Sequence, residues 1–127
     1  MKKLSSTLLL LAIVFVANAG VLTVSNATIN PGKYTSITAA IAAATAGDTI
    51  LVQGSINNYG SFNVDKKVVI IGPGHNPVDK QYQLPVTVDD INFTNANGSD
   101  SKIYGLNVSG INTSATSGTI FFIRALT

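Results

Sequence analysis

The feature of this sequence that most constrains its fold is a series of short β-branched segments separated by turn-forming residues. The segments are "TILVQ", "KVVIIG", "VTVDDINFT", "KIYGLNVSG" and "TIFFIRAL". Their apolar starts recur about every 17 to 18 residues, at Ile50, Val68, Val86, Ile103 and Ile120. A fixed period of this length is typical of stacked coils. A β-sandwich is the alternative, but its strands usually follow one another at shorter intervals.

The alanine-rich stretch from Tyr34 to Ala46 is the one segment with helical periodicity after the N-terminal region. Its apolar positions Ile37, Ala40, Ile41 and Ala44 lie on one face of a helix. Thr35 or Ser36 is the expected N-cap, and Gly47 is the expected C-terminal stop. The sequence therefore predicts a single amphipathic helix ahead of the strands.

Together these patterns predict an all-β fold, a right-handed parallel β-helix (solenoid) of about four to five coils with an N-terminal amphipathic capping helix. A left-handed hexapeptide helix is disfavoured because no six-residue aliphatic-Gly repeat is present. The open end of such a solenoid needs a cover, and we expect Ile37, Ile41, Gly47 and Asp48 to form this structural cap. Asp48 is expected to accept hydrogen bonds from nearby backbone N–H groups.

Residues 1–19 have the order of a secretory signal peptide. Lys2 and Lys3 precede an apolar run from Leu8 to Val16, and Ala17-Asn18-Ala19 follows it. We expect cleavage after Ala19, which leaves residues 20–127 as one small domain. The protein is then secreted, extracellular or held at the cell surface, with no membrane segment after cleavage.

Charge and cysteine content narrow the partners further. The formal net charge of +2 equals the charge of Lys2 and Lys3, so the domain that follows the leader is about neutral. A neutral domain is a poor partner for nucleic acid. The chain has no cysteine, so its stability must come from hydrogen-bond ladders and packed side chains.

The stretch from Pro31 to Gly74 resembles the N-terminal part of the pectin-lyase-like right-handed parallel β-helix superfamily. That group, which includes pectinesterases and many uncharacterised exported β-helix proteins, has a similar order: a helix, a Gly-Asp before the first strand, an excursion that ends in a strand, and an aliphatic pair followed by Gly-x-Gly. The matching residues are Gly32, Tyr34, Ser36, Ile37, Ala40, Ile41, Gly47, Asp48, Ile50, Val52, Val69, Ile70, Ile71, Gly72 and Gly74. The resemblance implies a fold but no activity, because lyases, esterases, hydrolases and non-enzymatic members share this opening.

No catalytic group is assigned, and three residues are the candidates that the sequence offers. Asp89 and Asp90 could act as an acid/base pair only at a bend, because adjacent strand residues point to opposite faces. Arg124, the only arginine, could hold a carboxylated sugar. His75 is the only histidine and has no acid partner on its own segment, so neither a triad nor a zinc site is expected.

Aromatic and amide side chains provide the candidates for ligand contact. Tyr59 and Tyr82 lie in loop-like segments, where a ring could stack on a sugar. No cofactor or metal is expected, and Ca²⁺ enters only if the chain is a fragment of a lyase. Five asparagines begin N-x-[ST] triplets, and we interpret them as turn-forming or stacked residues: Asn26, Asn92, Asn97, Asn107 and Asn112.

Three functions remain open on the sequence. The first is an exported non-catalytic module, an extracellular or cell-surface scaffold with weak polysaccharide binding. The second is the N-terminal fragment of a pectin- or polysaccharide-active lyase, esterase or hydrolase that lacks its catalytic coils. The third is a self-associating surface or adhesin-type subunit: "GTIFFIRALT" is an apolar strand with no cap after it, so a domain truncated there is expected to associate through its open C-terminal coil.

Overall fold

The computed structural model of the chain describes residues 18–73, 84–114 and 121–123. Within these ranges the chain forms short strands, one α-helix and one 3₁₀-helix. In chain order the elements are β1 (Val21–Val24), α1 (Ile37–Ala43), β2 (Thr49–Val52), β3 (Phe62–Val64), β4 (Val69–Ile71), β5 (Thr87–Phe93), η3 (Ala96–Gly98), β6 (Lys102–Tyr104), β7 (Asn107–Thr113) and β8 (Phe121–Ile123).

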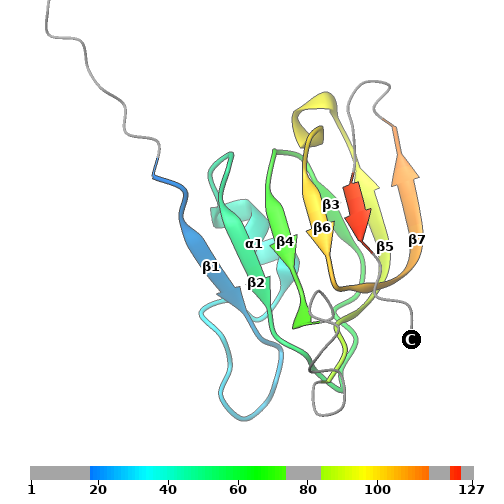
Figure 1. The fold of residues 1–127 in the computed structure, drawn as a ribbon. Helices are drawn as coiled ribbons and strands as arrows, with labels where there is room; N and C mark the ends of the chain where they lie inside the picture. The colour runs from blue at the N-terminus through cyan, green and yellow to red at the C-terminus, as the bar shows by residue number, and fades with distance from the viewer. Residues whose placement is uncertain (1–17, 74–83, 115–120, 124–127) are drawn as a thin grey trace, which may run out of the picture.

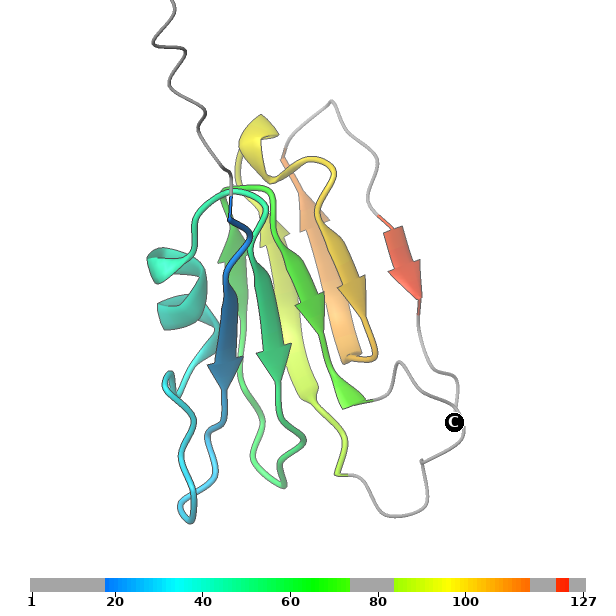
Figure 2. The same ribbon diagram turned by 60° about the vertical axis from the view of Figure 1, so that its left-hand side comes forward.

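The strands form two parallel sheets that lie face to face. The larger sheet has the order β1-β2-β4-β6-β8, and the smaller sheet has the order β3-β5-β7. Figure 1 shows that the strands of the two sheets run in opposite directions, and Figure 2 shows the sheets as two layers with α1 beside the β1 end. From β2 onward the chain passes from one sheet to the other with each successive strand.

The core lies between the sheets and is built from side chains in register. In the larger sheet one row of aligned residues is Leu22, Ile50, Ile70 and Ile103. In the smaller sheet Phe62 and Ile91 are aligned in the same way. All six side chains are buried, so β1 to β6 each add one apolar layer to a common core.

The helix forms where the sequence predicts it, but it is shorter. Ser36 is the N-cap, and its hydroxyl oxygen accepts a hydrogen bond from the backbone N–H of Ala39 at 3.1 Å. The buried face consists of Ile37, Ala40 and Ile41, and the helix contacts β1, β2 and β3. The prediction that Gly47 ends the helix is wrong. The C-cap is Ala44, and Gly47, with φ +98°, belongs to the turn before β2.

The predicted all-β parallel β-helix is wrong for this structure. The described residues form two small parallel sheets and one helix, an α/β-like arrangement in which no solenoid is found. The two sheets have five and three strands, and α1 packs on β1, β2 and β3. The predicted solenoid of four to five coils is therefore not the fold.

The periodicity misled because it counted strands of different sheets as equivalent. Ile50 and Ile103 lie in the larger sheet, whereas Val86 comes immediately before β5 of the smaller sheet. Between neighbouring strands of the larger sheet the register partners are separated by 28, 20, 33 and 19 residues. The pairs are Val21–Thr49, Thr49–Val69, Val69–Lys102 and Lys102–Phe121. The chain therefore has no constant repeat.

The sequence pattern also missed three features of the strands. β1 lies directly after the predicted leader, and β3 is not among the strand segments that the residue pattern predicts. The segment "KIYGLNVSG" is two strands, β6 and β7, which belong to different sheets. Gly105 separates them with φ +69°, a backbone conformation that favours glycine. Among the described residues, no helix is long and apolar enough to cross a membrane.

Candidate functional site

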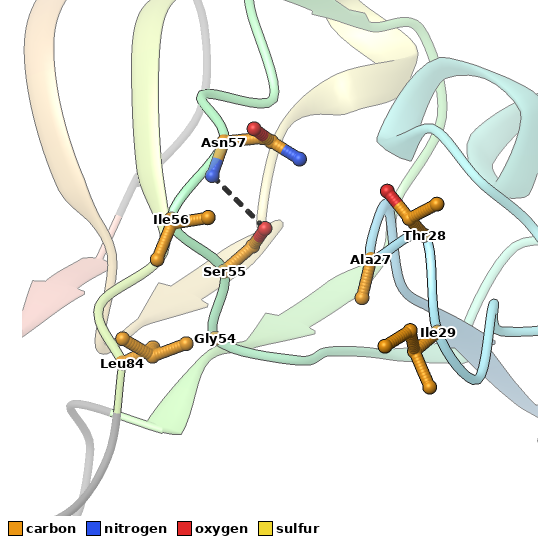
Figure 3. Close-up of a pocket in the computed structure, with 8 residues that line it drawn as sticks. All are labelled: Ala27, Thr28, Ile29, Gly54, Ser55, Ile56, Asn57 and Leu84. Atoms are coloured by element: carbon orange, nitrogen blue, oxygen red, sulfur yellow. Dashed lines mark hydrogen bonds between the residues drawn. The ribbon is translucent and has the colours of Figure 1, made fainter.

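An open apolar groove of about 330 Å³ lies beside the ends of β1 and β2. It is formed by the loop after β1, by the loop after β2 and by Leu84, as Figure 3 shows. Ile29 and Ile56 are 82% and 85% exposed, although both are large aliphatic residues. The residues that line the groove are Ala27, Thr28, Ile29, Gly54, Ser55, Ile56, Asn57 and Leu84.

Backbone contacts hold the floor of this groove in place. The backbone N–H of Ser55 donates to the carbonyl oxygen of Pro85 at 3.0 Å. A side chain at Gly54 would overlap the carbonyl oxygen of Leu84, so the two chain segments touch through their backbones. The hydroxyl oxygen of Ser55 accepts the backbone N–H of Asn57 at 3.0 Å, the bond drawn in Figure 3. The groove therefore has an ordered base and two exposed aliphatic walls.

Tyr59 joins the two loops that form the groove. Its hydroxyl donates to the carbonyl oxygen of Gln53 at 2.7 Å and accepts the backbone N–H of Asn26 at 3.3 Å. Its ring packs against the buried core, and this burial raises the pKa of the phenol above its usual value of 10.0. These contacts give Tyr59 a structural role. Its predicted contact with a sugar ring stays a prediction.

Asn26 reinforces the same junction. Its side-chain amide donates to the carbonyl oxygens of Asn57 at 3.4 Å and Asn58 at 3.3 Å. The side-chain oxygen of Asn26 is buried and has no hydrogen-bond partner. The amide of Asn26 thus fastens the loop after β1 to the loop after β2, and its interpretation as a turn-forming residue stays a prediction.

Three asparagines form a hydrogen-bonded ladder across the smaller sheet. Asn112 of β7 donates its amide N–H to the side-chain oxygen of Asn92 of β5 at 2.9 Å. Asn92 donates in turn to the side-chain oxygen of Asn63 of β3 at 3.1 Å. The interpretation of Asn92 and Asn112 as stacked residues is confirmed. Asn63, which begins no N-x-[ST] triplet, was missed.

Asp89 and Asp90 lie on β5 at an interruption of the strand's alternation. Val88 and Ile91 are both fully buried although they are three residues apart, so the alternation of buried and exposed side chains is interrupted at the two aspartates. Asp89 is exposed and accepts a hydrogen bond from the side-chain amide of Asn58 at 2.7 Å. The acid/base role of the two carboxylates stays a prediction.

Asp90 is half-buried, and its surroundings come from both neighbouring strands. Its backbone N–H donates to the hydroxyl oxygen of Ser61 at 3.2 Å. Its carboxylate lies against Gly110 of β7, where an added Cβ would overlap one carboxylate oxygen. We use the name polar sheet face for the ladder together with this group, that is Asn58, Ser61, Asn63, Asp89, Asp90, Asn92 and Asn112.

The remaining candidates have different positions. Arg124, Tyr82 and His75 lie outside the described residues. In the ranges that the structure describes, no group of three or more His, Cys, Asp or Glu side chains could hold a metal ion. The chemistry of the described site is therefore that of amides, hydroxyls and two carboxylates.

Asp48 is buried at the junction between α1 and β2. One carboxylate oxygen accepts the backbone N–H of Thr45 at 2.8 Å, and the other accepts the backbone N–H of Gly20 at 2.7 Å. The prediction that Asp48 bonds backbone N–H groups is confirmed. The bonds from Thr45 and then Gly20 hold the pKa of this carboxyl below its ordinary value of 3.8.

Sequence reasoning missed most of the polar sheet face. Asn58, Ser61 and Asn63 were not named, because the residue pattern placed no strand at β3 and gave no sign of its alignment with β5. The signal was nevertheless present, since "SFNV" has the apolar-polar alternation of a short strand. Comparison of the chain with protein-family models, curated proteins and solved structures found no match.

Proposed function

We propose that this chain is an exported, non-catalytic module that works outside the cell or at its surface and binds polysaccharide weakly through the polar sheet face. The observation that carries the proposal is the Asn63–Asn92–Asn112 ladder, a row of amide groups at the spacing of adjacent strands. Adjacent strands are about 4.8 Å apart, so such a row can contact successive hydroxyl groups of an extended glycan.

The ladder has a direction that suits this role. Each amide donates toward β3, so the ladder begins with the carbonyl oxygen of Asn112 and ends with the NH₂ group of Asn63. Sugar hydroxyl groups can both donate and accept hydrogen bonds. An acceptor at one end of the row and a donor at the other can therefore both be satisfied by one glycan chain.

The groups on the polar sheet face favour binding over catalysis. Amide side chains neither take up nor release protons near neutral pH, so the ladder cannot act as a general acid or base. The carboxylate of Asp89 is engaged by Asn58. The aliphatic groove begins next to this pair, because Asn57 lines it and Asn58 follows. A sugar could therefore meet polar and apolar surfaces together.

Export is the second part of the proposal and rests on residues 1–19. Their order of two lysines, an apolar run and Ala-Asn-Ala is typical of a secretory leader. The domain after Ala19 carries no cysteine, and its two sheets and core need none to form. We infer that the leader is removed after Ala19 and that the domain functions outside the cell.

Affinity electrophoresis in gels that contain pectin, polygalacturonate or methylated pectin tests the binding. We expect retardation of the wild-type chain, and Asn92→Ala should weaken it about fivefold because Asn92 makes both bonds of the ladder. Asn97→Ala is the matched control, since Asn97 is exposed on η3 and outside the polar sheet face. Equal retardation of Asn92→Ala and wild type, or none in any gel, would reject the proposal.

The same glycans distinguish a binding module from a fragment of an enzyme. The chain is incubated with each glycan, with and without Ca²⁺, and unsaturated products, reducing ends and released acid are measured. The proposed function predicts no product above the blank. Product formation that Asp89→Asn abolishes would overturn it and favour the polysaccharide-active enzyme.

The edge strand β7 favours self-association as a second candidate function. Phe62 and Ile91 are buried, but Ile111, which is aligned with Ile91, is 45% exposed. A second copy of the chain that adds to β7 would cover this side chain. Size-exclusion chromatography over a wide concentration range should show a concentration-dependent shift that Ile111→Lys abolishes and Ile56→Lys, a control in the groove, does not. A monomer at every concentration would exclude self-association.

A further inference from the structure

Cleavage of the leader after Ala19 would change the chemistry of the Gly20 backbone nitrogen. Its backbone nitrogen lies 2.7 Å from a carboxylate oxygen of Asp48. In the uncleaved chain this nitrogen is an amide with a single N–H. In the cleaved chain the same atom is the terminal amine of the mature domain, which is protonated at neutral pH.

We propose that Asp48 is the binding site for the mature N-terminus: removal of residues 1–19 turns the Gly20 nitrogen into an ammonium group that forms an ion pair with the Asp48 carboxylate. This inference rests on the proposed export. It adds that processing changes the domain itself as well as releasing it from the leader.

The distance and the burial favour such an ion pair. A separation of 2.7 Å already lies in the range of an N⁺–H···O⁻ bond, so no atom needs to move. Asp48 is 6% exposed in the uncleaved chain, so most of its carboxylate group is covered at the place where the ammonium group would form. The other carboxylate oxygen is held by Thr45, which keeps the acceptor oriented toward Gly20.

Strand pairing places Gly20 next to Asp48 before cleavage creates the charged amine. The carbonyl oxygen of Gly20 accepts the backbone N–H of Thr49 at 2.9 Å, and Val21 is the register partner of Thr49. Gly20 therefore directly precedes β1, and Asp48 directly precedes β2. Strand pairing already holds the two residues together, so forming the ion pair costs little further conformational entropy.

Glycine is the residue that leaves the most room for this arrangement. A Cβ at position 20 would lie 3.3 Å from one carboxylate oxygen and 3.4 Å from the other. These contacts are tight, so any side chain would press on the carboxylate. Residues 18 and 19 are exposed, which places the bond to be cleaved next to solvent while the nitrogen it frees faces a buried acid.

A cycle of four proteins tests the ion pair. The mature chain, residues 20–127, is prepared with a free amine and with an acetylated amine, each with Asp48 and with Asp48→Asn. Acetylation removes the charge but keeps one N–H, so it preserves the neutral hydrogen bond. With Asp48 present, acetylation should lower the folding equilibrium constant about tenfold, the difference between a charged and a neutral bond.

In the Asp48→Asn background the same acetylation should change the constant by less than about twofold, because no carboxylate remains to pair with the amine. Equal effects of acetylation in both backgrounds, or none in either, would overturn the proposal. If Asp48→Asn does not fold, the acylation rate of the free amine decides. The folded wild-type chain should react about tenfold more slowly than the chain in urea, and equal rates would overturn the inference.

Mass spectrometry of the exported protein separates this inference from the proposed function. A mass that corresponds to a chain beginning at Gly20 supports both export and the free amine. A mass that corresponds to a chain beginning at another residue, or to a chain that keeps the leader, overturns the inference because the ammonium group would not form at Gly20. Polysaccharide retardation is measured on the same samples and depends on the polar sheet face instead, so each proposal can fail alone.

Discussion

The two ends of the molecule differ in how the core is covered. At the β1 end, α1 places Ile37 and Ile41 over the core, and these side chains are 1% and 3% exposed. At the β7 end, Ile111 is 45% exposed although its register partner Ile91 is fully buried. One end is therefore closed by a helix, and the other ends in a strand whose apolar side chain faces solvent in the part of the chain that is described.

The difference shows that the position of a side chain in a row of aligned residues does not determine how much it contributes to the free energy of unfolding. Ile91 and Ile111 are the same residue type in the same row, but only Ile91 is enclosed on all sides. Removing buried atoms costs transfer free energy and leaves a cavity, whereas removing exposed atoms costs little of either. The covered end should therefore dominate the stability of the domain.

The largest expected effect comes from truncating the same residue type at the two ends. Ile37→Ala should lower the free energy of unfolding by about 2–5 kcal/mol, because it leaves a cavity under the helix. Ile111→Ala should cost less than about 1 kcal/mol, because water already reaches this side chain. Urea unfolding followed by circular dichroism measures both. Equal costs would mean that the β7 end is covered in solution.

A second comparison uses two glycines, one at each end. An added Cβ at Gly32 would lie 2.6 Å from the backbone nitrogen of Ser25, which is fixed after β1. At Gly110 it would meet a carboxylate oxygen of Asp90, which can rotate away. Gly32→Ala should cost about 1–3 kcal/mol and Gly110→Ala under about 1 kcal/mol. A larger cost at Gly110 would show that the Asp90 carboxylate is held rigidly.

Acid should remove the stabilisation that the Asp48 carboxylate contributes at the covered end. The pKa of Asp48 is lower in the folded chain than its ordinary value of 3.8, so its stabilisation is complete well above pH 3.8. It is lost as the pH falls below 3.8 through the lower pKa of the folded state. Thermal unfolding at pH 7 and pH 3 should therefore show a smaller loss of Tm in Asp48→Asn than in wild type. An identical loss would assign the acid sensitivity to other carboxylates.

The smallest expected effect concerns the amide ladder. Asn92→Ala removes the central member and both of its bonds, and should cost about 1 kcal/mol. Asn112→Ala removes a single bond on exposed β7 and should cost about half as much. Chemical denaturation of the two variants resolves this difference only if their m-values agree. A larger cost for Asn112 would indicate that β7 is the more protected strand.

Part of the fold could be predicted because some signals are local. The helix follows from the spacing of Ile37, Ala40 and Ile41, and Ser36 is a recognisable N-cap. The arrangement of the strands is not local, because it depends on which segments pair over 19 to 33 residues. β3 is only three residues long, and without it the division of the strands between two sheets could not be seen.

The candidate site was predictable to a similar degree. Asn92 and Asn112 were named as stacked residues, but their common partner Asn63 becomes visible only when β3 is placed beside β5. Asp48 was expected to bond backbone N–H groups. Its bond to Gly20 was not foreseen, because the two residues are 28 positions apart. Contacts of this kind depend on sheet register, which the sequence pattern alone left undetermined.

The strand pairing described above also determines how fast such a chain can fold. Every strand pair of the two sheets joins segments at least 19 residues apart, so no hairpin can form early and guide the rest. Folding rates fall as the mean sequence separation of contacts grows, and chains dominated by non-local pairing fold in milliseconds to seconds. The parallel architecture therefore predicts that this chain folds slowly and stays unfolded for longer than a chain built on hairpins.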